Sequence, residues 1–228
     1  MTADVRDVLN ARDERDPELP ARLLGAGREV LMPLLGECGE RELARYTACP
    51  GWTVRHVVAH CSAALNRVLE DRVEEAAFTP EGNDRDIAER ADWPHERLLA
   101  ELERGLTGAG AAIRAAGGPL DGIAFGEWVH VGDVQDALGR PGGYGGDALP
   151  DALALLGRLT RARGLTALHA DLDDQDEPVL LGAASGDAPP ARFLGSGATL
   201  VRLYAGRPVV GARYELAGAT ERDLLIYG

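Results

Sequence analysis

The sequence predicts an α+β fold, in which an N-terminal four-helix bundle is followed by a small C-terminal α/β domain. Through the first two thirds of the chain, apolar residues recur at steps of three and four, the period of an amphipathic helix. After a glycine-rich stretch at residues 140–150, the apolar runs become short and β-branched. We therefore predict two domains, residues 1–146 and 147–228, in a 228-residue chain that can bury a sizeable core.

Four helices are expected in the bundle, bounded by residues that commonly start or stop helices. Thr53 is a suitable N-cap after the Pro50-Gly51 pair, and Pro94 and Gly117 open and close another helix. The helical segments are residues 19–38, 53–75, 94–117 and 119–139. Short connections favour a bundle, and the polar stretch TPEGNDRD is expected to be a loop.

The C-terminal part is expected to combine one helix with short strands. Residues 151–172, DALALLGRLTRARGLTALHADL, have helical periodicity. Four later runs are apolar or β-branched and are separated by Gly or Asp, which is typical of strands. These runs are residues 178–183, 198–206, 208–216 and 223–228.

Charge and composition exclude several classes of partner. The formal net charge of −13, without any Lys/Arg cluster, argues against nucleic acid or an anionic membrane as a partner. The N-terminus lacks an apolar signal core and no segment has eighteen uninterrupted apolar residues, so we expect a cytoplasmic protein. We also expect a monomer or homodimer. Three cysteines, Cys38, Cys49 and Cys61, are an odd number without Cys-x-x-Cys spacing, and no disulfide framework is expected.

Three polar residues, Glu127, His130 and Asp133, follow one another at steps of three in the segment FGEWVHVGDVQDALGRP. On a helix Glu127 and His130 are about 60° apart, so both can point into the bundle core. A buried carboxylate requires a compensating cation, which no nearby Lys or Arg of this segment supplies. A divalent metal that also binds His60, on the second predicted helix, would satisfy both helices.

Other interpretations of the same pattern stay open. In one, Glu127 and Asp133 face water, and the histidines are ordinary helix or core residues. In another, the chain is a di-iron carboxylate bundle, but the required Glu-x-x-His pair occurs only once on a suitable helix. His56 is expected at the surface, and Cys61, about 100° from its neighbour His60 around the helix, is expected in the core.

Two motifs together resemble a known family. The stretches CPGWTVRHVVAH and EWVHVGDVQDALG are similar to the metal-binding helices of the DinB-like superfamily, and specifically of the mycothiol-dependent maleylpyruvate isomerase family of actinobacteria. The similarity extends to EGNDRDIAERA and to ATLVRLYAGRP near the C-terminus. It implies a DinB-like bundle in which His60, Glu127 and His130 bind a metal. One departure is that relatives commonly place the glutamate four residues before the histidine, where this chain has Gly126.

The resemblance also implies a chemistry. A His₂Glu set leaves an open coordination position, which is typical of catalytic zinc, and in the family this position faces the thiol cofactor mycothiol. A thiolate formed there would add to an activated cis double bond and leave after rotation, or would remain on the product as a thioether. Asp133 would orient a metal-bound histidine. Arg207, one of three arginines in the C-terminal runs with Arg202 and Arg213, would contact the anionic substrate or the thiol.

Three functions are therefore weighed. The first is a mycothiol-dependent metalloenzyme, either an isomerase or an S-transferase, that acts on a small electrophilic or anionic substrate. The alternative is a non-catalytic DinB-like metal-binding module with a regulatory or interaction role. The third is metal-assisted hydrolysis with Glu127 as the base.

Overall fold

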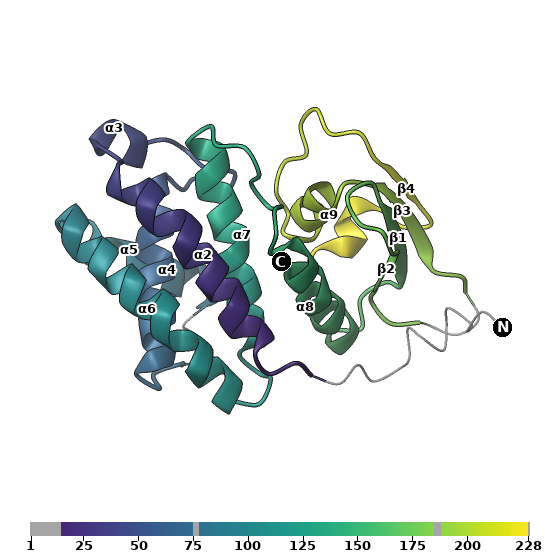
Figure 1. Cartoon of the computed structure of the whole chain (residues 1–228), viewed down its shortest axis with the longest axis horizontal. Helices are drawn as coiled ribbons and strands as arrows, with labels where there is room; N and C mark the ends of the chain where they lie inside the picture. The colour runs from purple at the N-terminus through teal and green to yellow at the C-terminus, as the bar shows by residue number, and fades with distance from the viewer. Residues whose placement is uncertain (1–14, 75–77, 185–187, 228) are drawn as a thin grey trace. The chain divides into compact units, whose positions relative to one another are not determined.

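The computed structural model describes residues 15–74, 78–184 and 188–227. These residues form two compact units, one over residues 17–143 and the other over residues 144–227 together with residues 15 and 16 (Figure 1). The first unit is helical, and the second combines helices with a four-stranded sheet. The predicted α+β class is confirmed. The change of unit falls in the glycine-rich stretch, while the limits 1–146 and 147–228 stay a prediction for the two domains.

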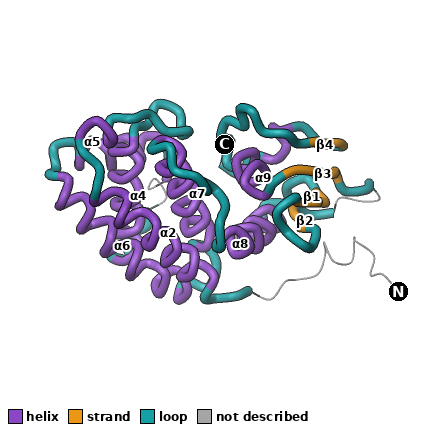
Figure 2. Tube along the Cα trace, turned by 45° about the horizontal axis from the view of Figure 1, so that its top comes forward, coloured by secondary structure: helices purple, strands orange, loops and turns teal. Residues whose placement is uncertain are grey.

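The N-terminal unit is a bundle whose long helices occupy the four segments that the sequence predicts. Its described helices are α2 (Leu19–Gly36), α3 (Glu40–Leu43), α4 (Val54–Leu69), α5 (Pro80–Arg90), α6 (His95–Ala115) and α7 (Asp121–Ala137). Helix α6 packs against α2 and α4, and α7 packs against the same two helices (Figures 1 and 2). Leucines such as Leu35, Leu65 and Leu98 are fully buried between them.

Two glycines of α6 let the helices approach closely. A Cβ added to Gly105 would lie 2.6 Å from the Cβ of Leu65 on α4, and one added to Gly110 would lie 2.7 Å from the Cα of Ala21 on α2. Because any larger side chain would push a helix backbone or its core leucine aside, the glycines set the spacing of α6 from both neighbours.

The expectation of a loop at residues 79–86 is wrong, because α5 begins there. Thr79 accepts a hydrogen bond from the Gly82 N–H at 3.1 Å, and Pro80 occupies the first helical turn. The helix has few apolar residues, and its fully buried Asp86 instead forms an ion pair with Arg67 of α4. This partner is distant in sequence, so local composition alone indicated a loop.

The C-terminal unit is a four-stranded sheet with two helices packed on it. The elements are α8 (Leu149–Ala162), β1 (Leu168–Leu172), β2 (Val179–Leu181), β3 (Ala191–Gly195), α9 (Gly197–Tyr204), β4 (Glu215–Ala217) and the 3₁₀ helix η2 (Glu221–Leu224). The strand order is β2-β1-β3-β4, with β1 parallel to β3 and the outer pairs antiparallel. Helix α8 contacts β2, and α9 contacts β3 and α8.

Several C-terminal predictions are wrong in their element type. The helix predicted over 151–172 ends at Ala162, and its last residues form β1. The predicted strand at 198–206 is α9, because Ser196 accepts the Thr199 N–H at 3.2 Å and caps a helix there. The strand predicted over residues 223–228 begins instead within the 3₁₀ helix η2. The strand predicted over residues 178–183 is present, because β2 lies within this run.

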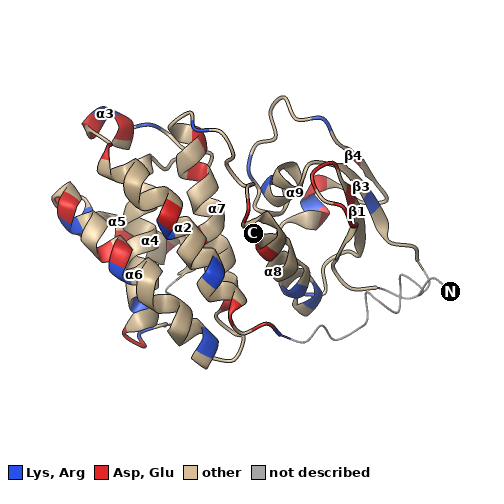
Figure 3. Ribbon diagram, in the orientation of Figure 1, with Lys and Arg blue, Asp and Glu red and all other residues tan. Residues whose placement is uncertain are grey.

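Acidic and basic residues are interspersed on the surface helices of the first unit, as along α5 and α6 (Figure 3). This mixture agrees with the absence of a basic stripe in the sequence. Among the described residues, none of the helices is both long and apolar enough to cross a membrane.

Candidate functional site

The candidate residues of α4 follow from the way in which this helix begins. Its N-cap Thr53 accepts a hydrogen bond from the His56 N–H at 3.3 Å, and His56 Nδ1 accepts the Thr53 N–H at 3.4 Å. His56 is therefore a partly buried capping residue. One turn further, His60 is only 8% exposed, in a helix that is buried on nearly all sides.

Helix α7 buries all three polar residues that the sequence singled out. Glu127 is 5% exposed, His130 is 9% exposed and Asp133 is fully buried. Apolar neighbours such as Trp128 and Val134 are buried as well, so the helix has an interior environment around most of its circumference. The interpretation in which Glu127 and Asp133 face water is therefore wrong.

The structure brings His60 and His130 together. Their ring centroids lie 5.3 Å apart, with the ring planes at 75°. Trp52, in the turn before α4, contacts both rings, with centroid distances of 5.0 Å to His60 and 5.9 Å to His130. Residues from α4, α7 and the preceding turn thus meet at one point inside the bundle.

Asp133 holds the ring of His130. The Nδ1 atom of His130 lies 2.9 Å from Asp133 Oδ2, and the contact is buried. In neutral histidine, an Nδ1–H that donates to the carboxylate leaves the lone pair on Nε2. This is the tautomer of a histidine that binds a metal through Nε2, with a carboxylate as its outer partner.

The carboxyl group of Glu127 lies beside the thiol of Cys61 on α4. Burial raises the pKa of Glu127 to about 8, and the neighbouring Cys61 thiol opposes this shift. Burial and the same glutamate raise the pKa of Cys61. Without a bound cation, Glu127 is therefore largely protonated at neutral pH.

His60 is the least satisfied polar group of the site. Within the part of the chain that the structure describes, its Nδ1 atom is buried and has no hydrogen-bond partner. Burial, followed by the neighbouring charges of His130 and Arg67, lowers the pKa of His60 to about 3. The ring is therefore neutral at physiological pH and can act as a ligand.

The full three-residue metal set is not assembled in the described residues: no group of three or more His, Cys, Asp or Glu side chains is arranged to hold a metal ion. The two histidines meet, while the carboxyl group of Glu127 is engaged with Cys61. Metal binding by His60, Glu127 and His130 stays a prediction.

The arginines proposed for anion binding lie in the C-terminal unit. Arg207 follows α9 and is partly buried, and its Nη1 donates to the Ala205 carbonyl at 3.0 Å. The guanidinium of Arg202 lies 4.1 Å from the ring centroid of Tyr144, and Arg213 is exposed. The role of Arg207 toward substrate or thiol stays a prediction.

Trp52 and the Cys61–Glu127 contact were missed by reasoning from the sequence. Cys61 is buried as expected, but its contact with Glu127 depends on the packing of α4 against α7. Trp52 had a usable signal, since a large aromatic residue directly follows a Pro-Gly turn and precedes the N-cap of a buried helix.

Comparison with known proteins shows to which family the chain is similar. The family described as the mycothiol maleylpyruvate isomerase N-terminal domain matches residues 24–141, which contain Trp52, His60, Glu127, His130 and Asp133. Two crystal structures, one of a mycothiol-dependent maleylpyruvate isomerase and one of a mutant of that enzyme, are similar to this chain. Each is 16% identical to it in sequence with a TM-score of 0.54, and each match covers 96% of this chain and 98% of the crystallised chain. At this identity the likeness concerns the fold. No functionally curated protein matches the sequence. Because the family match spans more than half of the 228 residues, the chain belongs to the mycothiol maleylpyruvate isomerase family.

Proposed function

We propose that the chain is a mycothiol-dependent metalloenzyme that catalyses cis–trans isomerisation or transfers a thiol to a small electrophile. The observation that carries this proposal is the meeting of two buried imidazoles, 5.3 Å apart, from two helices of the bundle. A buried ring nitrogen without a partner in the described structure, such as Nδ1 of His60, is costly unless something binds to it. An ion or a ligand at this point would remove that cost.

The donor chemistry fits a divalent metal, with zinc as the first expectation. Two imidazoles and a carboxylate make up a common catalytic zinc set that leaves one position open. His130 is already oriented by Asp133, and the buried carboxyl group of Glu127 would ionise beside a bound cation. Glu127 would join the set by turning its carboxyl group from the Cys61 thiol toward the two histidines.

The residues of the chain would prepare the site for a thiol. When bound there, the metal would lower the pKa of a coordinated thiol, so that thiolate is present at neutral pH. Asp133 keeps the Nδ1 proton of His130 and thereby presents Nε2 as a ligand. His60 and His130 are only 8% and 9% exposed, so little of the histidine pair is in contact with water. Arg207 would supply positive charge for an anionic substrate or for mycothiol.

Metal content and ligand-dependent stability test the proposal. We expect purified wild-type protein to contain about one zinc per chain by elemental analysis, and His60→Ala to lose it, while His169→Ala in the other unit retains it. Mycothiol should raise the melting temperature of the wild-type protein but not that of His60→Ala, because a ligand of the native state stabilises it. Isomerisation of maleylpyruvate, followed with and without mycothiol, then tests the catalytic step.

A non-catalytic DinB-like module, with a regulatory or interaction role, is the second candidate. It is favoured by the position of Glu127, whose carboxyl group lies beside Cys61. Both candidates fit a cytoplasmic protein with small-molecule partners. Mycothiol-dependent turnover of any electrophile would argue against the second candidate, whereas metal binding without turnover would favour it.

A further inference from the structure

We propose that Trp52 is a positioning residue, whose indole ring holds the imidazoles of His60 and His130 in the orientation in which both bind a metal. The inference rests on the proposed metal binding by these two histidines. Trp52 itself cannot be a ligand, because the indole nitrogen is a donor without a lone pair for a metal.

The three rings form a closed triangle with centroid distances of 5.0, 5.3 and 5.9 Å. Trp52 stacks on His130 with 19° between the planes and meets His60 at 57°. At its edge, the ring of His130 is also held by Asp133, through Nδ1 at 2.9 Å. The indole therefore contacts both imidazoles and limits how each ring can turn about its side-chain bonds.

The backbone of Trp52 is fixed by a tight turn. Its N–H donates to the Cys49 carbonyl at 3.1 Å, and its carbonyl accepts the Thr47 N–H at 2.9 Å and the Thr47 hydroxyl at 3.0 Å. Gly51 has φ of +78°, a value that a turn of this kind requires and that glycine adopts without strain. The turn leads directly into the Thr53 cap, so the position of the indole is set by the start of α4.

Metal binding would strengthen these ring contacts. An imidazole bound to a divalent cation carries partial positive charge, which is attracted to the electron-rich face of an indole. Removal of the indole abolishes both the ring stack and this attraction, and we expect it to lower the metal affinity about 3- to 30-fold. A phenyl ring would retain part of the effect, and an aliphatic side chain would retain little.

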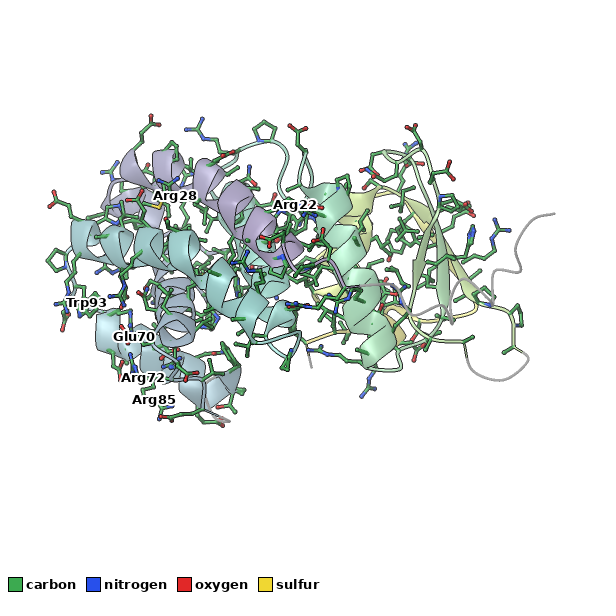
Figure 4. All side chains as sticks on the ribbon, turned by 60° about the horizontal axis from the view of Figure 1, so that its bottom comes forward. Arg22, Arg28, Glu70, Arg72, Arg85 and Trp93 are labelled. Carbon is green, nitrogen blue, oxygen red and sulfur yellow. The ribbon has the colours of Figure 1, made fainter. Side chains whose placement is uncertain are left out.

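Cobalt(II) titration of the full-length, metal-free protein tests the proposal. We compare wild type with Trp52→Phe, Trp52→Leu and the control Trp93→Leu. Trp93, labelled in Figure 4, packs under the guanidinium of Arg97 at 3.5 Å from the ring centroid and contributes no contact to the histidine pair in the described structure. We expect Trp52→Leu to bind cobalt about 3- to 30-fold more weakly, Trp52→Phe to be intermediate, and Trp93→Leu to match wild type. The cobalt absorption bands should shift in the Trp52 variants alone.

The outcomes separate this inference from the proposed function. If wild type binds no metal, the proposed function and this inference are both wrong. If Trp52→Leu binds cobalt as tightly as wild type, only the positioning role is wrong. Should Trp52→Leu fail to fold, as judged by circular dichroism, the absorption bands of Trp52→Phe decide: bands identical to wild type overturn the role, and altered bands support it.

Discussion

Removal of one partner of the ion pair between Asp86 and Arg67 should be strongly destabilising, because it leaves a buried charge uncompensated. The carboxylate is fully buried, the guanidinium side chain is 15% exposed, and two hydrogen bonds join them, one of 2.8 Å from Nη1 to Oδ2. Asp86→Ala would leave a largely buried guanidinium without its partner. We expect the free energy of unfolding to fall by about 3–5 kcal/mol, a large fraction of the total for a domain of this size.

An exposed pair in the same bundle provides a matched control. Arg28 and Glu103 are joined by an N···O distance of 2.8 Å, but their side chains are 44% and 47% exposed, and Arg28 is labelled in Figure 4. Because water screens and replaces such a contact, Glu103→Ala should cost no more than about 1 kcal/mol. The two ion pairs differ chiefly in burial.

Urea unfolding of metal-free protein, followed by circular dichroism, measures both changes. The double variant of Asp86→Ala with Arg67→Met should be more stable than Asp86→Ala alone, because it leaves no unpaired buried charge. The reasoning is refuted if Asp86→Ala costs no more than Glu103→Ala, or if adding Arg67→Met lowers the stability further.

Three further predictions concern the packing and the site. Gly105→Ala places a methyl group 2.6 Å from a core leucine and should cost about 1–3 kcal/mol, while Gly25→Ala, with open space around it, should be neutral or stabilising; thermal melts distinguish the two. In metal-free protein the pKa of Glu127 is raised from 4.5 to about 8, so the native state holds the proton of this group more tightly than the unfolded state does. The stability that this proton gives the native state is fully present below pH 4.5 and is lost as the pH rises through 8. The free energy of unfolding of Glu127→Gln, relative to that of wild type, should therefore rise by about 3 kcal/mol from about pH 4 to pH 7. Urea unfolding at each pH measures this difference, and a difference that does not change with pH would contradict the effect of burial on Glu127. Asp133→Asn removes the carboxylate that orients His130 and should weaken zinc binding by about 10- to 100-fold in a chelator competition, with little change if the contact is incidental.

The helices of the bundle could be predicted from the sequence because their signals are local. A period of three to four residues, a threonine cap and Pro-Gly boundaries lie within each segment, and they located α2, α4, α6 and α7. Helix α5 was missed because its burial depends on Asp86 meeting Arg67, a residue on another helix. The run at 198–206 was misassigned because a short apolar segment fits a strand or a helix equally, and the Ser196 cap decided for the helix.

For the candidate site, the sequence by itself determined which side chains share a helix face, since spacing along a helix sets their angular positions. It also determined, through two motifs, the family to which the chain belongs. Only the tertiary structure decided that His60 and His130 meet, that Asp133 holds one of them, and that Glu127 contacts Cys61. The physical reason is that helical periodicity fixes directions within one helix, whereas distances between helices depend on how whole cores pack, down to single glycines such as Gly105.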